Sequence, residues 1–231
     1  MLRTIGLIGG MSWESTAIYY RLANELVRDR LGGLHSARIV MTSVDFAEVE
    51  ELQATGQWDR AAELLVAEAA RLEAAGADFL VLCTNTMHKV AGAIEASASV
   101  PLLHLGDVTA DAVRSAGLDT VALLGTAFTM SSQDFYRGRL ESHGLHVLVP
   151  DEDDQALVHR VIYDELCQGL VLDESRRAYV DIVDRLVARG AQGVILGCTE
   201  IELLIREDDL AVPSFPTTRI HVEAAVDRAL S

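Results

Sequence analysis

The chain has few basic residues and few cysteines, and both shortages narrow what the protein can do. Its 231 residues include 19 Lys and Arg against 35 Asp and Glu, which gives a formal net charge of −16. Such a chain repels nucleic acid phosphates and anionic membranes, so we expect neither as a partner. Lys89 is the only lysine, and a pyridoxal phosphate enzyme would have to form its Schiff base there. Any attraction for an anionic substrate must be local.

Long apolar runs and a disulfide framework are also missing. No apolar stretch approaches the ~18–20 residues that span a bilayer. The chain begins with a strand-like segment within four residues, without a charged-then-apolar leader. The three cysteines, Cys83, Cys167 and Cys198, are odd in number, which favours a reducing compartment. These features predict a cytoplasmic protein.

Short apolar segments alternate with helical patterns along the whole chain. The predicted strands are Thr4–Gly10, Arg38–Ser43, Phe79–Cys83, Leu102–Leu105, Thr120–Gly125, His146–Val149, Val194–Leu196 and Val212–Phe215. Because helices separate the strands, the sheets should be parallel and doubly wound.

The second half of the chain repeats the first. The segment TVALLG at Thr120–Gly125 lies 116 residues after TIGLIG at Thr4–Gly9. Likewise, GAQGVILGCTE matches GADFLVLCTNT, and this alignment places Cys198 opposite Thr84, 114 residues earlier. Two nearly equal offsets indicate two similar half-chains with a small deletion.

The repeat predicts a specific domain organisation. We expect two pseudo-symmetric, doubly wound parallel-sheet (Rossmann-like) α/β domains, with the active site in the cleft between them. The N-terminal domain should comprise residues 1–106 and 210–231, because it otherwise ends early, and the C-terminal domain residues 107–209.

Two strand ends carry polar groups suited to chemistry. The strand Phe79–Cys83 stops at Thr84, and a helical pattern follows; in parallel sheets, exposed N–H groups at this junction favour an anion. Cys198 occupies the same kind of junction, which predicts a lowered pKa and a thiolate near neutral pH. The alternative for Cys198 is a buried small hydrophobe. Cys83 should point away from the face of Thr84 and belong to the core.

Other motifs carry weaker signals. The glycines at residues 6–10 lack the G-x-G-x-x-G spacing of a dinucleotide site, and could equally let the backbone approach a small carboxylate. The pair His143 and His146 has no third ligand, so a surface turn is favoured over a metal site. His88 and His221 could each serve a cysteine as a base, or act as hydrogen-bonding residues.

Four segments together resemble the aspartate/glutamate racemase family. They are TIGLIGGMSWEST at residues 4–16, CTNTMHK at 83–89, GCTEIELL at 197–204 and TTRIH at 217–221. The similarity runs the length of the chain and is closest to the branch that contains L-aspartate/glutamate-specific enzymes. The resemblance implies racemisation without a cofactor, by two opposed thiols, one from each domain.

This sequence departs from the usual family pattern at two places. Thr84 stands where most members have the first-half cysteine, a substitution for which the L-specific branch is known. The resemblance then makes Cys198 the base that deprotonates the L-substrate, with Thr84 in the position of the second thiol. Relatives often have Phe-Asp-Thr where this chain has Phe-Pro-Thr at residues 215–217, so any role of that acid is in doubt.

Eight further positions match family positions near the substrate: Met11, Gln53, Asn85, Thr86, Met87, Glu165, Thr199 and Glu200. Among them, the hydroxyl, amide and N–H groups of Asn85, Thr86 and Thr199 would bind the α-carboxylate. Glu200 would receive the ammonium group or orient Thr199.

Three readings of the function stay open. The first is a racemase that interconverts L- and D-aspartate or glutamate. The second is an isomerase or decarboxylase of a small diacid on the same fold. The third is an amino-acid binding protein without activity, since one of the two usual thiols is missing. The oligomeric state is open, with a homodimer as one option.

Overall fold

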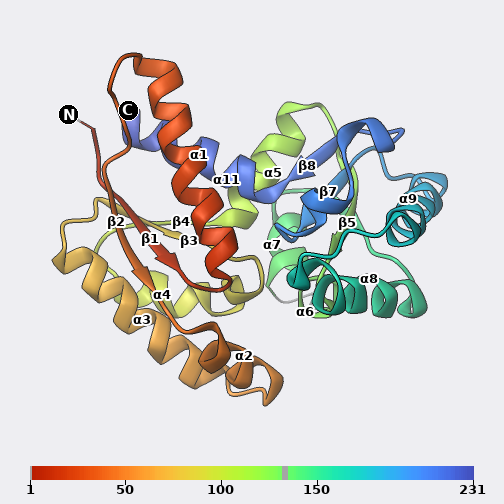
Figure 1. Cartoon of the computed structure of the whole chain (residues 1–231), viewed down its shortest axis with the longest axis horizontal. Coiled ribbons are helices and arrows are strands. Elements are labelled where there is room, and N and C mark those ends of the chain that lie inside the picture. Colours follow the sequence, from red (N-terminus) through yellow and green to blue (C-terminus); the bar gives the residue numbers. More distant parts are fainter. Residues whose placement is uncertain (1, 132–134) are drawn as a thin grey trace. The chain divides into compact units, whose positions relative to one another are not determined.

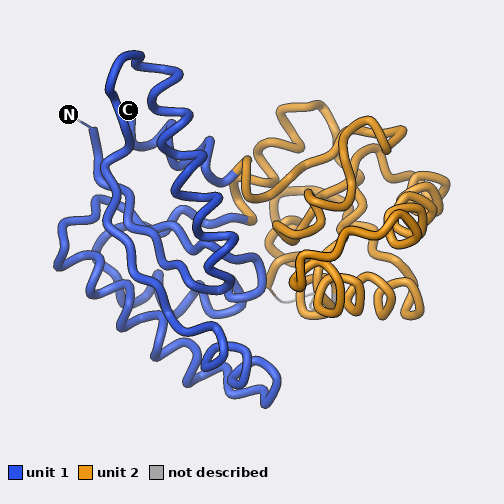
Figure 2. The backbone as a smooth tube through the Cα atoms, in the orientation of Figure 1, with its two compact units in different colours: residues 1–105, 221–231 blue, residues 106–220 orange. Residues whose placement is uncertain are grey.

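The computed structural model describes residues 2–131 and 135–231, and the chain divides into two compact units (Figure 2). The first unit contains the residues up to Leu105 and His221–Ser231, and the second contains Gly106–Ile220. The strands are β1 (Ile5–Gly9), β2 (Ile39–Ser43), β3 (Phe79–Leu82), β4 (Leu102–Leu103), β5 (Thr120–Gly125), β6 (His146–Leu148), β7 (Val194–Gly197) and β8 (Ser214–Pro216).

Helices connect these strands throughout (Figure 1). The α-helices are α1 (Trp13–Leu31), α2 (Phe46–Ala54), α3 (Trp58–Ala74), α4 (Ala91–Ser97), α5 (Leu105–Ser115), α6 (Ala127–Ser131), α7 (Tyr136–Ser142), α8 (Glu152–Asp164), α9 (Asp173–Ala188), α10 (Ile201–Leu204) and α11 (Thr217–Leu230). The 3₁₀ turns are η1 (Thr86–Val90), η2 (Leu166–Gln168) and η3 (Glu207–Asp209). Within residues 2–131 and 135–231, no helix is long and apolar enough to cross a membrane.

Each unit is built on a four-stranded parallel sheet, and the two sheets have equivalent strand orders. The first runs β2-β1-β3-β4 and the second β6-β5-β7-β8. The pairing register is also similar, since Ile8 pairs with Leu82 and Leu124 pairs with Leu196. The predicted fold class, two related α/β domains with parallel sheets, is therefore confirmed.

Helices cover both faces of the first sheet. Phe79, Val81 and Cys83 pack with α1 and α11 on one face, whereas Leu80 and Leu82 pack with α3 and α4 on the other. Figure 1 shows α1 and α11 on one side of this sheet and α3 and α4 on the opposite side. This alternation is the strand period of two. It confirms that Cys83, which is fully buried, belongs to the core.

The equivalent face of the second sheet carries a core cluster of that unit. Val194 and Leu196 pack there against α8 and α9, and the partly buried Cys198 lies against the same cluster. The matching residues of β3 are Leu80 and Leu82, because the offset is 114 in both pairs. Cys198 therefore follows β7 as Thr84 follows β3.

The last strand differs from the expected domain division. Residues 210–231 were expected in the N-terminal domain, but β8 pairs with β7 in the second sheet, Ile195 opposite Phe215. The first unit resumes only at His221, within α11. A three-residue strand carries too little pattern to identify its partner, so the sequence predicted a strand here but not the sheet to which it belongs.

The first glycine turn is filled by the protein itself. A Cβ on Gly9 would lie 2.4 Å from Cγ2 of Thr16, and one on Gly10, whose φ is +97°, would lie 2.3 Å from the carbonyl oxygen of Val44. The Gly10 N–H donates to Oγ1 of Thr16 at 2.9 Å. Close packing against α1 and the segment after β2 thus explains these glycines without a nucleotide.

Candidate active site

Thr84 lies at the carboxyl end of β3 with both of its backbone polar groups bonded. Its N–H donates to the carbonyl of Leu82 at 2.8 Å, and its carbonyl oxygen lies 2.7 Å from Nδ1 of His88. The Thr84 side chain is partly exposed, whereas the next four side chains are buried. The turn thus presents the Thr84 hydroxyl beside a buried segment.

Three residues predicted near the substrate lie together in the first unit. Met11 and Met87 belong to one buried cluster of the first sheet. The buried Gln53 donates from Nε2 to the Met87 sulfur at 2.9 Å. Asn85 and Thr86, also buried, directly precede Met87. The carboxyl end of β3 therefore combines the apolar side chains of Met11 and Met87 with hydroxyl and amide groups.

Cys198 and Glu200 form a hydrogen-bonded pair after β7. The Cys198 thiol donates to Oε2 of Glu200 at 2.9 Å. Thr199, between them, is buried. The Glu200 carboxylate therefore accepts a hydrogen bond from the thiol, a contact that the sequence did not predict.

The predicted low pKa of Cys198 is wrong for this structure. Burial raises the pKa of the thiol well above its usual value of 9.0, and the Glu200 carboxylate raises it further. A helix start alone favours a thiolate, but an adjacent carboxylate and an apolar surrounding disfavour the second negative charge. Cys198 is therefore a protonated thiol in this arrangement, with a proton acceptor already in contact.

Glu165 also lies near this end of the second unit. It is the C-cap residue that follows α8, and it accepts a hydrogen bond from Ser175 Oγ at 2.5 Å. Burial, then the charges of Cys198 and Glu165, raise the pKa of Tyr179, so both groups act on the same phenol. Tyr179 donates to the carbonyl of Val158 at 2.8 Å.

Sequence reasoning missed Glu202 as a member of this region. Burial raises its pKa from 4.5 to about 7; the Arg219 charge opposes the shift and the Glu200 charge adds to it. Its Oε1 atom is buried and has no hydrogen-bond partner among residues 2–131 and 135–231. The available signal was the Glu-x-Glu spacing in GCTEIELL, which places a second carboxyl one turn from Cys198.

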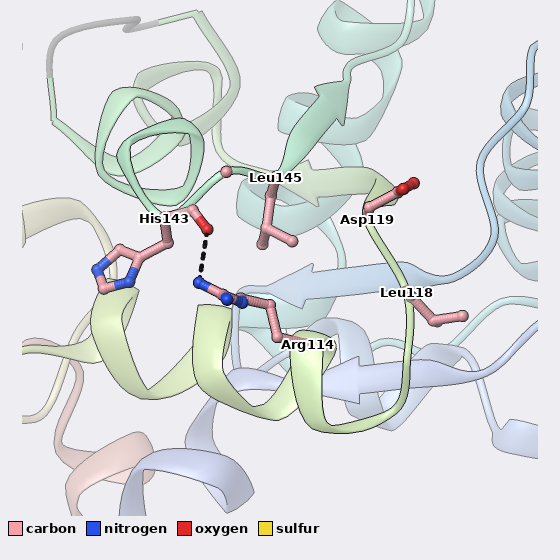
Figure 3. A pocket seen from close by; sticks show the side chains of 6 residues that line it. Arg114, Leu118, Asp119, His143 and Leu145 are labelled. Carbon is pink, nitrogen blue, oxygen red and sulfur yellow. Dashed lines mark hydrogen bonds between the residues drawn. The ribbon is translucent and has the colours of Figure 1, made fainter.

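A cavity of about 390 Å³ in the second unit is separate from the predicted residues (Figure 3). It is lined by Arg114, Leu118, Asp119, His143, Gly144 and Leu145. Arg114 Nη1 donates to the His143 carbonyl at 3.1 Å, and the His143 ring contacts Asp107 at 2.8 Å.

In the part of the chain that the structure describes, no group of three or more His, Cys, Asp and Glu could hold a metal ion.

Comparisons with known proteins identify the family. The family model of Asp/Glu/hydantoin racemases matches residues 8–225. This chain therefore belongs to the Asp/Glu/hydantoin racemase family, in agreement with the resemblance seen in its motifs.

Solved structures give the same assignment. The crystal structure of a proposed Asp/Glu racemase from Yersinia pestis is 53% identical, covers 100% of both chains and has a TM-score of 0.95. An aspartate racemase homologue from Pyrococcus horikoshii OT3 is 32% identical over 100% of both chains, with a TM-score of 0.88. Arylmalonate decarboxylase, at 17% identity over 98% of this chain and 92% of its own, shares the fold alone, with a TM-score of 0.56.

Proposed function

We propose that the protein is a cofactor-independent amino-acid racemase that interconverts L- and D-aspartate or glutamate. One observation carries the proposal: the Cys198 thiol donates to Glu200 at the strand end that is equivalent, in the duplicated fold, to the one carrying Thr84. Family membership supports a racemase reaction. The proposal requires Cys198 and Thr84 to reach opposite faces of one substrate in a cleft between the domains.

The proposed reaction begins with proton transfer inside the Cys198–Glu200 pair. Glu200 accepts the thiol proton, and the resulting thiolate takes the α-proton of the L-substrate. The electrons of the broken C–H bond remain on the substrate as a carbanion conjugated with its carboxylate. The Thr84 hydroxyl then donates a proton to the opposite face and regains one from water, while Glu200 releases its proton to solvent.

The raised pKa of Cys198 is compatible with this sequence of steps. A permanently ionised thiol would be a weaker base, whereas a thiolate formed only beside the substrate is desolvated and strongly basic. Thr84 cannot ionise near neutral pH, so its hydroxyl acts only as a donor or a relay.

The residues around each strand end suggest how the substrate is held. Asn85, Thr86 and Thr199 offer amide, hydroxyl and backbone N–H donors for the α-carboxylate. Met11, Gln53 and Met87 would limit the space behind Thr84, and Glu165 would line the substrate near Cys198. With a net charge of −16, local hydrogen bonds rather than the overall field must bind an acidic amino acid.

A decarboxylase or a small-diacid isomerase is the alternative on the same fold. Arylmalonate decarboxylase shares the fold, so the fold alone does not distinguish a racemase from a decarboxylase. A single incubation separates these functions. L-aspartate or L-glutamate is incubated in D₂O, α-hydrogen exchange is followed by NMR, and the enantiomers are separated by chiral chromatography.

The racemase proposal expects α-deuteration of the L-substrate and the appearance of α-deuterated D-product. Stoichiometric CO₂ release, or binding without exchange, would instead support the decarboxylase or the binding protein. Substituted malonates that carry the side chain of aspartate or of glutamate are supplied in a parallel incubation. They serve as the test substrates for decarboxylation.

The Cys198–Glu200 step is tested with Glu200→Gln in a Cys167→Ser background, which removes an exposed thiol. Losing the proton acceptor should slow exchange of the L-substrate by about 10²- to 10⁴-fold. Removing the carboxylate charge should also lower the pKa of Cys198, measured from the pH dependence of alkylation by iodoacetamide. Unchanged or faster exchange in Glu200→Gln would show that Cys198 needs no acceptor.

A further inference from the structure

Three histidine rings gather inside the first unit, beside the carboxyl ends of β3 and β4. His88, His104 and His221 have 2%, 6% and 0% of their surface exposed. The ring centroids of His88 and His104 are 4.7 Å apart, and those of His88 and His221 are 5.9 Å apart. These residues are far apart in the sequence, so the fold alone assembles the group, which we call the histidine cluster.

Hydrogen bonds define the tautomer of His88. The backbone N–H of Leu105 donates to Nε2 of His88 at 3.1 Å, so Nε2 carries no proton. Nδ1 lies 2.7 Å from the Thr84 carbonyl oxygen, which can only accept. The neutral ring therefore carries its proton on Nδ1 and donates it to Thr84.

This bond helps to fix the Thr84 side chain. The two backbone N–H groups that precede this carbonyl also have fixed contacts: Cys83 N–H donates to the Ile8 carbonyl at 2.9 Å, and Thr84 N–H to the Leu82 carbonyl at 2.8 Å. The His88 contact holds the remaining polar group of the Thr84 backbone. A β-branched side chain has few χ1 rotamers for a given backbone, so holding the carbonyl also limits where the hydroxyl points.

The histidine cluster also contacts both points at which the chain passes between the units. Leu105, which bonds to His88, is the last residue of the first stretch of unit one, and His221 is the first residue after the chain returns. Nε2 of His221 donates to the carbonyl of Leu103 at 2.8 Å. Thr84, β4 and the start of the returning segment are therefore joined through imidazole rings.

We propose that His88 is a positioning residue for the Thr84 side of the reaction: its Nδ1–H holds the Thr84 carbonyl and thereby aims the Thr84 hydroxyl at the substrate. This inference rests on the racemase function proposed above. His88 itself transfers no proton to substrate in this role. Nothing in the mechanism at Cys198 depends on it.

Two substitutions separate the two hydrogen bonds of the ring. In His88→Asn, the side-chain amide lies at the position of Nδ1 and can still donate to Thr84, but does not reach Leu105. In His88→Gln, the amide oxygen reaches the position of Nε2 and can accept from Leu105, but the donor to Thr84 is lost. The variants are compared by incubating L-aspartate and L-glutamate in D₂O.

The incubation reports on the two sides of the substrate separately. Deuterium in the remaining L-substrate measures abstraction and return at Cys198, whereas deuterated D-product measures delivery on the Thr84 side. We expect His88→Gln to lower D-product formation relative to L-side exchange by about 10- to 100-fold, since small misplacements of reacting groups have effects of that size. His88→Asn should restore most of the wild-type ratio.

One control variant separates a loss of stability from a loss of positioning, and one NMR measurement tests the tautomer of His88 directly. Tyr19→Phe removes the hydroxyl that contacts Nδ1 of His221 at 3.0 Å; it should lower stability without changing the ratio. In the unsubstituted protein, ¹⁵N NMR should show the Nδ1-protonated tautomer of His88, and an Nε2-protonated ring would overturn the proposal whatever the variants do.

The remaining outcomes distinguish this proposal from the proposed function. If wild-type protein exchanges and inverts the substrate but His88→Gln keeps the wild-type ratio, the positioning role is wrong and the racemase stands. Equal changes in the Asn and Gln variants would likewise refute positioning through Thr84. If the wild-type protein shows neither exchange nor inversion, the racemase function fails first and removes the basis for the role of His88.

Discussion

Acid should destabilise the first unit through one buried histidine. His221 is fully buried; its Nδ1 contacts the Tyr19 hydroxyl at 3.0 Å and its Nε2 the Leu103 carbonyl at 2.8 Å. Because the carbonyl accepts from Nε2–H, Nδ1 of the neutral ring accepts from Tyr19. Burial lowers the pKa of His221 from 6.5 to about 4; the bond to Leu103 opposes this shift, and the charge of His104 adds to it.

The size and sign of the effect follow from this shift. As the pH falls below 6.5, the unfolded chain takes up a proton at His221 while the folded chain remains neutral until about pH 4. The stability contribution is therefore complete above pH 6.5 and is lost progressively down to about pH 4. At about 1.4 kcal/mol per pH unit, the loss amounts to roughly 3 kcal/mol. That is a large share of the ~5–15 kcal/mol that stabilises a typical domain.

The assay is urea unfolding from about pH 7.5 to pH 4.5, followed by tryptophan fluorescence. Both tryptophans, Trp13 and Trp58, lie in the first unit, so the signal reports on the unit that contains His221. His221→Gln can still donate to Leu103 but cannot be protonated. Its free energy of unfolding should be lower at neutral pH and should fall by about 2–3 kcal/mol less than that of wild type on acidification.

An exposed histidine provides the matched control. His35 lies in the exposed segment after α1, and His35→Gln makes the same side-chain replacement outside the core. If His221→Gln and wild type lose stability in parallel as the pH falls, the linkage argument is wrong and another group controls acid unfolding.

Three further predictions concern single residues near the two strand ends. Cys198→Ala should abolish exchange of the L-substrate measured in D₂O, whereas Cys83→Ala should leave exchange intact and cost about 1 kcal/mol of stability in urea unfolding; reversed losses would contradict the assignment. Thr84→Cys should raise exchange that starts from the D-substrate, because a thiol can take either protonation state near neutral pH, and equal wild-type rates from both enantiomers would refute a single base. Glu202→Gln should be more stable than wild type above about pH 7, by roughly 3 kcal/mol, and equal to it below pH 4.5, since a raised carboxyl pKa means lost stability as the pH rises; a constant difference across this range would exclude Glu202 as the source.

Much of the fold was predictable because the sequence repeats itself. The nearly equal offsets from Thr4 to Thr120 and from Thr84 to Cys198, 116 and 114 residues, are visible without coordinates. The period of two along Phe79–Cys83 correctly assigned Cys83 to the core. The same patterns placed Thr84 and Cys198 at equivalent strand ends. The internal repeat and the strand alternation are properties of the sequence itself, so they can be recognised without knowledge of the tertiary structure.

The electrostatics of the strand ends depended on tertiary structure. The strand-to-helix motif predicted a low thiol pKa for Cys198, but the orientation of Glu200 and the packing of α8 and α9 decide the direction. The histidine cluster was equally hidden, because His88, His104 and His221 come from three separate segments. A sequence pattern identifies a candidate side chain, whereas its protonation depends on which charges and apolar groups the fold places against it.

The ends of β3 and β7 have equivalent positions in the fold but carry different side chains. Thermodynamics limits what this difference can change in the proposed reaction. In the proposed racemase, a thiol with a carboxylate acceptor follows β7, and a hydroxyl held through a histidine follows β3. Mirror-image amino acids have equal free energies in water, so the equilibrium ratio is one whatever residues are used. The difference between Thr84 and Cys198 can therefore appear only in barriers and in the binding of each enantiomer. Replacing the thiol by threonine on one side would leave the end point unchanged, and kcat/KM for inversion must stay equal from the two enantiomers. The asymmetry appears instead in solvent exchange, which is fast at the L-substrate and slow at its mirror image, provided that the relay through Thr84 limits the return.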